Sequence, residues 1–181
     1  MSNLSSSFLK TEEMEFAQSF LEKGYVIGEV ESPSALNKIR NFIVDVSSSH
    51  LSIECPTKKR LFLDDISNNI EIKHLNRLRL SVIKSIRTAS WFRHSYFSLA
   101  HNMISMMVGN ELAMQKTINL SIQMPHDESS ILPIHSDVLN GNSPFEVVLW
   151  IPLVDCFHTK SMYIVPPDKS TLILKQLSEF D

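Results

Sequence analysis

The chain is poor in cysteine and glycine. Cys55 and Cys156 are its only cysteines, too few and too far apart for a disulfide scaffold or a cysteine-rich zinc module. Only four glycines are present, and no stretch resembles a phosphate-binding glycine loop. The first residues lack the apolar core of a signal peptide, and the longest apolar run, residues 147–154, is too short to span a bilayer. These absences predict a protein of the cytoplasm with no membrane segment.

Neither charge sign dominates the chain. A formal net charge of −3 argues against a dedicated nucleic-acid binder, which would usually be basic overall. A hydrophobic content of 43% and a charged content of 20% are ordinary for a globular protein. With 181 residues, the sequence predicts one domain over 1–181.

The first 110 residues are predicted to be mainly helical. Apolar residues at helical spacing predict a helix over 12–23 that ends before Gly24, and a second that begins at Ser32-Pro33. A long helix carries Leu75, Leu78, Val82 and Ile86 on one face, and another runs from about residue 96 to 108. Between the first two helices, residues 25–30 are predicted to form a short strand.

From residue 111 the hydrophobic period changes from helical to alternating. In "TINLSIQM", Ile118, Leu120 and Ile122 alternate with polar residues, which is typical of a half-buried strand. Further strands are predicted over 134–138, 145–153 and 161–167. Because strands and helices do not alternate, the pattern disfavours a doubly wound parallel sheet. The order favours an antiparallel sandwich or barrel over 111–181, packed against the N-terminal helices.

His135 and Asp137 are the leading candidates for a metal site. Alternate residues of a strand share a face, so these two side chains would lie side by side with Ser136 turned away. Two histidines and one carboxylate are the protein ligands of many non-haem Fe(II) centres. The other interpretation is a partly buried histidine hydrogen-bonded to a neighbouring carboxylate, and the spacing alone leaves both open.

Four segments carry a resemblance to a known family. In order and spacing, "NLSIQMP", "SSILPIHSD", "GNSPFEVVLWIPLVD" and "SMYIVPP" resemble the sporadic 2-oxoglutarate- and Fe(II)-dependent oxygenases of bacterial carbohydrate-biosynthesis clusters, which are similar to phytanoyl-CoA dioxygenases. The resemblance implies an α+β protein with a double-stranded β-helix, or jelly roll, buttressed by helices. It also implies Fe(II) and 2-oxoglutarate as cofactors and a carbohydrate or sugar-derived substrate.

The same resemblance assigns roles to five residues. It makes His135 and Asp137 iron ligands and places Trp150 beside the cosubstrate. Asn119 and Gln123 would contact cosubstrate or substrate, or else only cap the edge of a sheet. Related halogenases replace the carboxylate ligand with a small residue, so Asp137 implies a hydroxylase or desaturase.

Two further elements of the family's site have no match in this sequence. Such enzymes take a third iron ligand from a later histidine and bind the outer carboxylate of 2-oxoglutarate with a later arginine. After Asp137 the chain has only His158, predicted to be a surface histidine between strands, and its last arginine is Arg93. We therefore expect a jelly roll that is incomplete at the C-terminus and weak or inactive alone, unless a homo-oligomer or a completing chain supplies the missing groups.

Two other functions compete with the oxygenase. One is a non-catalytic jelly roll that binds a carbohydrate or a partner, and the other is a cupin-like sugar isomerase or epimerase.

A basic helical region is expected to be a solvated face, with contact to an anionic substrate as the alternative. It comprises Lys73, Arg77, Arg79, Lys84, Arg87 and Arg93. His94 and His101, seven residues apart on one predicted helix, are interpreted as packing or surface residues.

Overall fold

The protein is described by a computed structural model that covers residues 10–109, 111–128, 131 and 133–178. Helices make up most of the regular structure there. The α-helices are α1 (Thr11–Lys23), α2 (Pro33–Leu51), α3 (Lys59–Asp64), α4 (Ile72–Thr88), α5 (Phe92–Phe97), α6 (His101–Val108) and α7 (Pro167–Ser178). Two short 3-10 helices, η1 (Ile66–Asn68) and η3 (His158–Lys160), complete the order.

Local sequence signals determine where the first two helices begin and end. Gly24 ends α1 in the left-handed conformation, with φ of 76°, which glycine adopts without a steric penalty. The Ser32 hydroxyl accepts a hydrogen bond from the Ala35 amide at 3.4 Å, and Pro33 takes the first helical position of α2. The predicted end of the first helix at Gly24 and the predicted start of the second helix at Ser32 are both confirmed.

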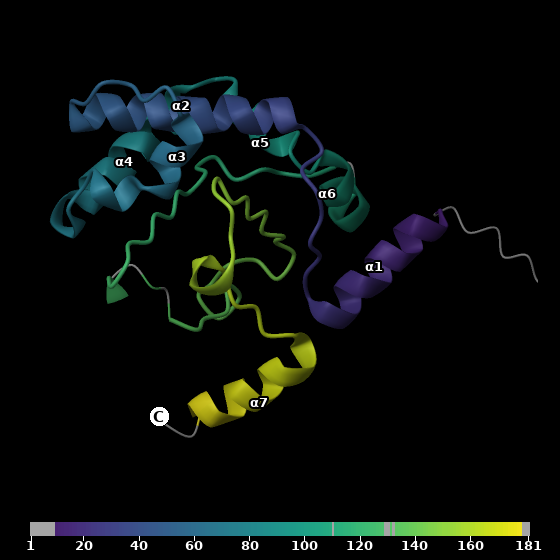
Figure 1. Ribbon diagram of the computed structural model, residues 1–181. Helices are drawn as coiled ribbons and strands as arrows, with labels where there is room; N and C mark the ends of the chain where they lie inside the picture. The colour runs from purple at the N-terminus through teal and green to yellow at the C-terminus, as the bar shows by residue number, and fades with distance from the viewer. Residues whose placement is uncertain (1–9, 110, 129–130, 132, 179–181) are drawn as a thin grey trace, which may run out of the picture.

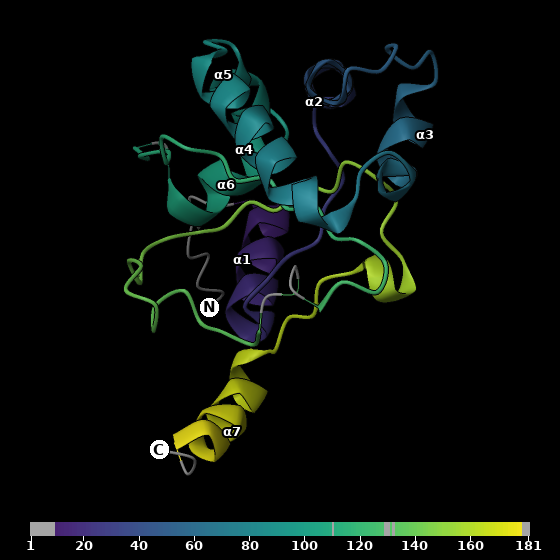
Figure 2. The same ribbon diagram turned by 90° about the vertical axis from the view of Figure 1, so that its left-hand side faces the viewer.

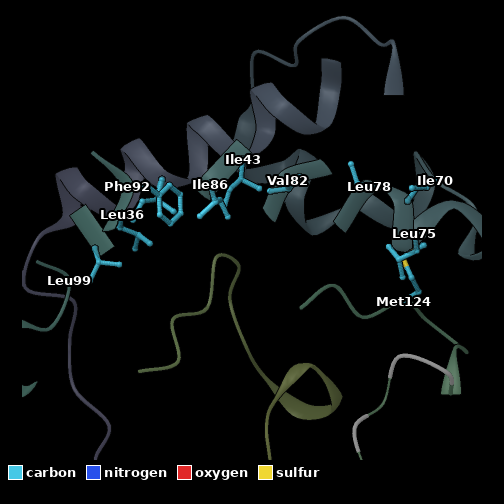
Figure 3. Packing of buried hydrophobic residues seen from close by; sticks show 11 residues of the cluster. Leu36, Ile43, Ile70, Leu75, Leu78, Val82, Ile86, Phe92, Leu99 and Met124 are labelled. Atoms are coloured by element: carbon cyan, nitrogen blue, oxygen red, sulfur yellow. The ribbon is translucent and has the colours of Figure 1, made fainter. Parts of the chain in front are cut away.

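A layer of helices holds the hydrophobic core. Helix α2 packs on α3, α4 and α5 (Figure 1). Val44 of α2 and Leu78 and Val82 of α4 have no exposed surface, which confirms the predicted apolar face of the long helix. Figure 3 shows the buried residues in a row along the helical layer, from Leu99 at one end to Ile70, Leu75 and Met124 at the other.

The predicted helix over 96–108 is two helices. Helix α5 ends at Phe97, and α6 begins at His101 and ends before Gly109, whose φ is 79°. The break turns the chain through Ser98 and Leu99, and Leu99 is fully buried. The stop at Gly109 is confirmed, while the continuous helix is wrong.

The predicted double-stranded β-helix is wrong. No β-strand occurs in the described ranges, so the strands expected at 25–30, 117–124, 134–138, 145–153 and 161–167 are wrong there. The chain instead runs through extended and irregular segments that lie between the helical layer and α7 (Figures 1 and 2). The α+β jelly roll is thus replaced by a helical layer with extended segments beneath it.

The alternating pattern reports burial against helices, not pairing in a sheet. Ile118, Leu120 and Ile122 pack against the helical core, while the alternating Asn119, Ser121 and Gln123 are exposed. A β-sheet also needs a neighbouring strand whose backbone N–H and C=O groups form hydrogen bonds with those of the first strand. Within the described residues, no backbone hydrogen bond joins 117–123 to another segment. An alternating pattern of apolar and polar residues can therefore arise from one apolar face packed on helices, without a sheet.

Side chains of the helical layer bind carbonyls of the extended segments. Three arginines and one tyrosine donate these bonds, over 2.6 to 3.2 Å. The bonds run from Arg40 to Leu153, from Arg79 to Ile122, from Arg93 to Met114 and from Tyr96 to Leu149. Such bonds attach a segment without a sheet, because they satisfy carbonyls that a ladder would otherwise bond.

Among the described residues, no helix combines the length and the apolar character needed to cross a membrane.

Candidate metal site

His135 and Asp137 lie at the start of a tight turn. The Asp137 carbonyl accepts hydrogen bonds from the amides of Asn140 and Asn142 at 3.1 and 3.0 Å. Gly141 closes the turn with φ of 90°, a conformation that disfavours side chains. The strand predicted for this stretch is absent, but the turn still brings the side chains of His135 and Asp137 close together.

The two side chains face each other without a hydrogen bond between them. His135 Nε2 lies 3.8 Å from Asp137 Oδ1, beyond hydrogen-bond range. His135 Nδ1 lies 2.8 Å from the Pro133 carbonyl oxygen, and since a carbonyl only accepts, Nδ1 carries the proton of that bond. In the neutral ring the lone pair is then on Nε2, the nitrogen nearer Asp137. Metal-binding histidines commonly have this arrangement, with the distal N–H bonded to a carbonyl.

The donor set fits two adjacent positions around a divalent transition metal. Nitrogen and carboxylate ligands lie about 2.1 Å from such an ion, so adjacent octahedral ligands are about 3 Å apart. The two ligand atoms would have to approach each other by about 0.8 Å from their separation of 3.8 Å. Both side chains are on the surface, with 40% and 48% of their area exposed, so a small rotation is sterically free.

No third protein ligand stands beside this pair in the described part of the chain. No group of three or more His, Cys, Asp or Glu residues there could hold a metal ion. His158 lies on the surface, with its ring against Phe157 at 5.8 Å. Asp155 is ion-paired with Arg60. The described residues thus supply two ligands, not the three of a complete non-haem iron centre.

The other three predicted site residues are on the surface. Trp150 is 45% exposed, and Asn119 and Gln123 are exposed as well. Among described residues, no hydrogen bond joins any of the three side chains to His135 or Asp137. The structure brings together His135 and Asp137 and leaves Trp150, Asn119 and Gln123 exposed on the surface. Their roles stay predictions.

A second group of polar residues joins Arg93, for which the sequence leaves contact to an anionic substrate open, with two histidines that the sequence does not predict to lie beside it. Arg93 and His94 of α5 and His101 of α6 line a hollow of about 350 Å³ with Phe97, Leu112 and Met114. The two histidines were treated as packing or surface residues of one helix. The available signal was an arginine and two histidines within nine positions, with no carboxylate among them.

Comparisons with known proteins do not place the chain in a family. No family model matches it, and neither curated proteins nor solved structures give a match.

Proposed function

We propose that the chain is a non-haem Fe(II)- and 2-oxoglutarate-dependent oxygenase of the hydroxylase type, acting on a carbohydrate or sugar-derived substrate. The observation that carries the proposal is the geometry of His135 and Asp137: two metal-binding side chains face each other, and the distal nitrogen of the histidine is held by a carbonyl. The order and spacing of residues in the surrounding segments resemble those of the oxygenases and support the same chemistry, although these segments form none of the expected strands.

In this proposal His135 and Asp137 hold the metal. Pro133 has a positioning role, because its carbonyl keeps the proton on Nδ1 and leaves Nε2 to the metal. Asp137 supplies a negative charge that lowers the net charge of the bound ion. Iron and 2-oxoglutarate, when bound, supply the oxidation chemistry with O₂, while the protein supplies orientation and the binding surface.

We expect a weak site and little turnover from this chain alone. Two exposed protein ligands leave most positions of the metal to water, and exposed ligands gain little from a low dielectric. A second copy or another chain that supplies a histidine and an arginine would raise both metal affinity and turnover.

Equilibrium dialysis against Fe(II) under anaerobic conditions tests the metal site. His135→Ala and Asp137→Ala should each abolish stoichiometric binding, while His158→Ala and Asp168→Ala, which remove an exposed histidine and an acidic residue of α7 from outside the pair, should not. Equal binding by all four variants would contradict the assignment of His135 and Asp137. Robust succinate formation by the isolated chain would contradict the expectation of weak turnover.

A partner-binding module is the second candidate, favoured by one observation. Large apolar side chains are exposed along residues 131–164, among them Phe145 at 91% and Ile134 at 73%. Exposed apolar side chains, where they gather on one surface, often mark protein–protein contacts. This function would not depend on His135 or Asp137, so the dialysis variants also separate the two candidates.

A further inference from the structure

A hollow with a basic lining lies between α5, α6 and residues 112–114. Its polar lining comes from Arg93 and His94 of α5 and from His101 and Ser105 of α6. Its apolar lining comes from Phe97, Leu112 and Met114. The volume of about 350 Å³ is within the range of small-molecule sites.

The polar side of this Arg93 hollow favours an anion. Arg93 is always charged and presents five N–H donors, of which one nitrogen is bonded to the Met114 carbonyl at 2.7 Å. That bond orients the guanidinium and leaves other donors for a ligand. His94 and His101 are both exposed and add two ring edges that can donate to oxygen.

Among the described residues, no carboxylate opposes an anion inside the hollow. The described lining contains neither Asp nor Glu. Glu31 lies at the start of α6, where its carboxylate accepts hydrogen bonds from the Asn102 and Met103 amides at 3.0 and 3.2 Å. Those bonds hold Glu31 as the cap of α6, outside the hollow's lining.

The apolar side favours a ring or another flat apolar body on the ligand. Phe97 meets the His101 ring edge-on, with 5.0 Å between ring centres, so the two rings are held at a fixed angle. Leu112 and Met114 form the apolar wall from the extended segment.

We propose that the Arg93 hollow binds a small phosphomonoester that carries a ring. The guanidinium would bind two phosphate oxygens in its fork, the imidazoles would donate to phosphate oxygens, and the ring would lie against Phe97, Leu112 and Met114. A phosphate is favoured over a carboxylate because three donor side chains match three free oxygens. The proposal does not use His135 or Asp137, so it stands or falls independently of the oxygenase.

Calorimetric titration of the full chain with three probes tests the ligand class. Phenyl phosphate should bind at least tenfold more tightly than benzoate, and also more tightly than inorganic phosphate. Benzoate binding as tightly as phenyl phosphate would overturn the choice of phosphate. Inorganic phosphate binding as tightly as phenyl phosphate would overturn the ring.

Variants assign the binding to this hollow. Arg93→Gln should weaken phenyl phosphate binding at least tenfold, and Arg93→Lys should give an intermediate loss because it keeps the charge without the fork. Arg87→Gln, on the exposed surface of α4, is the matched control and should bind as the native chain does. Native affinity in Arg93→Gln would overturn the proposal.

A second measurement keeps the proposal testable if Arg93→Gln does not fold. Phenyl phosphate should shift the imidazole C–H resonances of His94 and His101 in the native chain and leave those of His50 and His74 unmoved. Equal shifts in all four histidines, or none in His94 and His101, would contradict the site.

Discussion

At the scale of single residues, side-chain spacing was informative even where the expected backbone was absent. His135 and Asp137 were expected side by side because strand residues alternate, and a turn brings them within 3.8 Å instead. Residues two positions apart in the sequence stay close in space in any backbone conformation. The pairing of these side chains could therefore be predicted, whereas the third ligand, which depends on distant segments, could not.

Tyr96 gives a prediction at this scale. Burial raises the pKa of Tyr96 to about 12, and its hydroxyl donates to the Leu149 carbonyl at 2.6 Å. Tyr96→Phe should lower the free energy of unfolding by about 1 kcal/mol, because the Leu149 carbonyl loses its partner. Denaturant unfolding of both chains measures this difference.

The pH dependence of that difference has a definite sign. Since the folded-state pKa lies above the ordinary value near 10, the folded chain holds the phenolic proton more tightly than the unfolded chain. The stability due to Tyr96 is therefore complete below about pH 10 and is lost as the pH rises toward 12. Tyr163→Phe, at an exposed position, is the control and should leave stability at neutral pH unchanged. If the stability advantage of the native chain over Tyr96→Phe increased above pH 10, the account would be contradicted.

At the scale of elements, helices were predictable and sheets were not. Gly24, Pro33 and Gly109 act within one turn of the chain, so their effect can be predicted locally. A strand forms only when a second segment pairs with it. Ile118 and Ile122 alternate as strand residues do, yet they pack on the helical core, and the Ile122 carbonyl is bonded by Arg79.

Arg40 tests how the extended segments are attached. Its Nε donates to the Leu153 carbonyl at 2.8 Å, and its pKa is lowered mainly by burial and then by the charge of Arg60. Arg40→Gln removes this attachment, so amide hydrogen exchange in 147–156 should become about fivefold faster, the equivalent of about 1 kcal/mol. Exchange in α4 should not change. Arg77→Gln, exposed on α4, is the control, and the same acceleration in that variant would contradict a specific role for Arg40.

At the scale of the whole molecule, the apolar surface is unevenly distributed. The helical layer holds most of the buried core, although Leu80 of α4 is 57% exposed, while residues 131–164 leave Phe145, Leu139 and Tyr163 at 91%, 70% and 87% exposure. The sequence could not show this difference, because the same alternating pattern is compatible with burial in a sheet. An exposed apolar surface favours association.

Self-association is the prediction that follows. Sedimentation velocity at rising protein concentration should show larger species, and Phe145→Ser with Leu139→Ser should reduce them at least several-fold. Met14→Ser, an exposed apolar residue on α1, is the control and should associate as the native chain does. A native chain that stays monomeric at every concentration would contradict the prediction.

The most direct test of the proposed oxygenase is an anaerobic titration of the purified chain with Fe(II) and 2-oxoglutarate. Chelation of iron by 2-oxoglutarate gives a visible charge-transfer band, and no sugar substrate is needed to observe it. The account predicts a weak band that saturates at high Fe(II), disappears in Asp137→Ala and persists in Asp168→Ala. A folded native chain without any band, or a band of equal strength in Asp137→Ala, would contradict the assignment of His135 and Asp137 as the iron site.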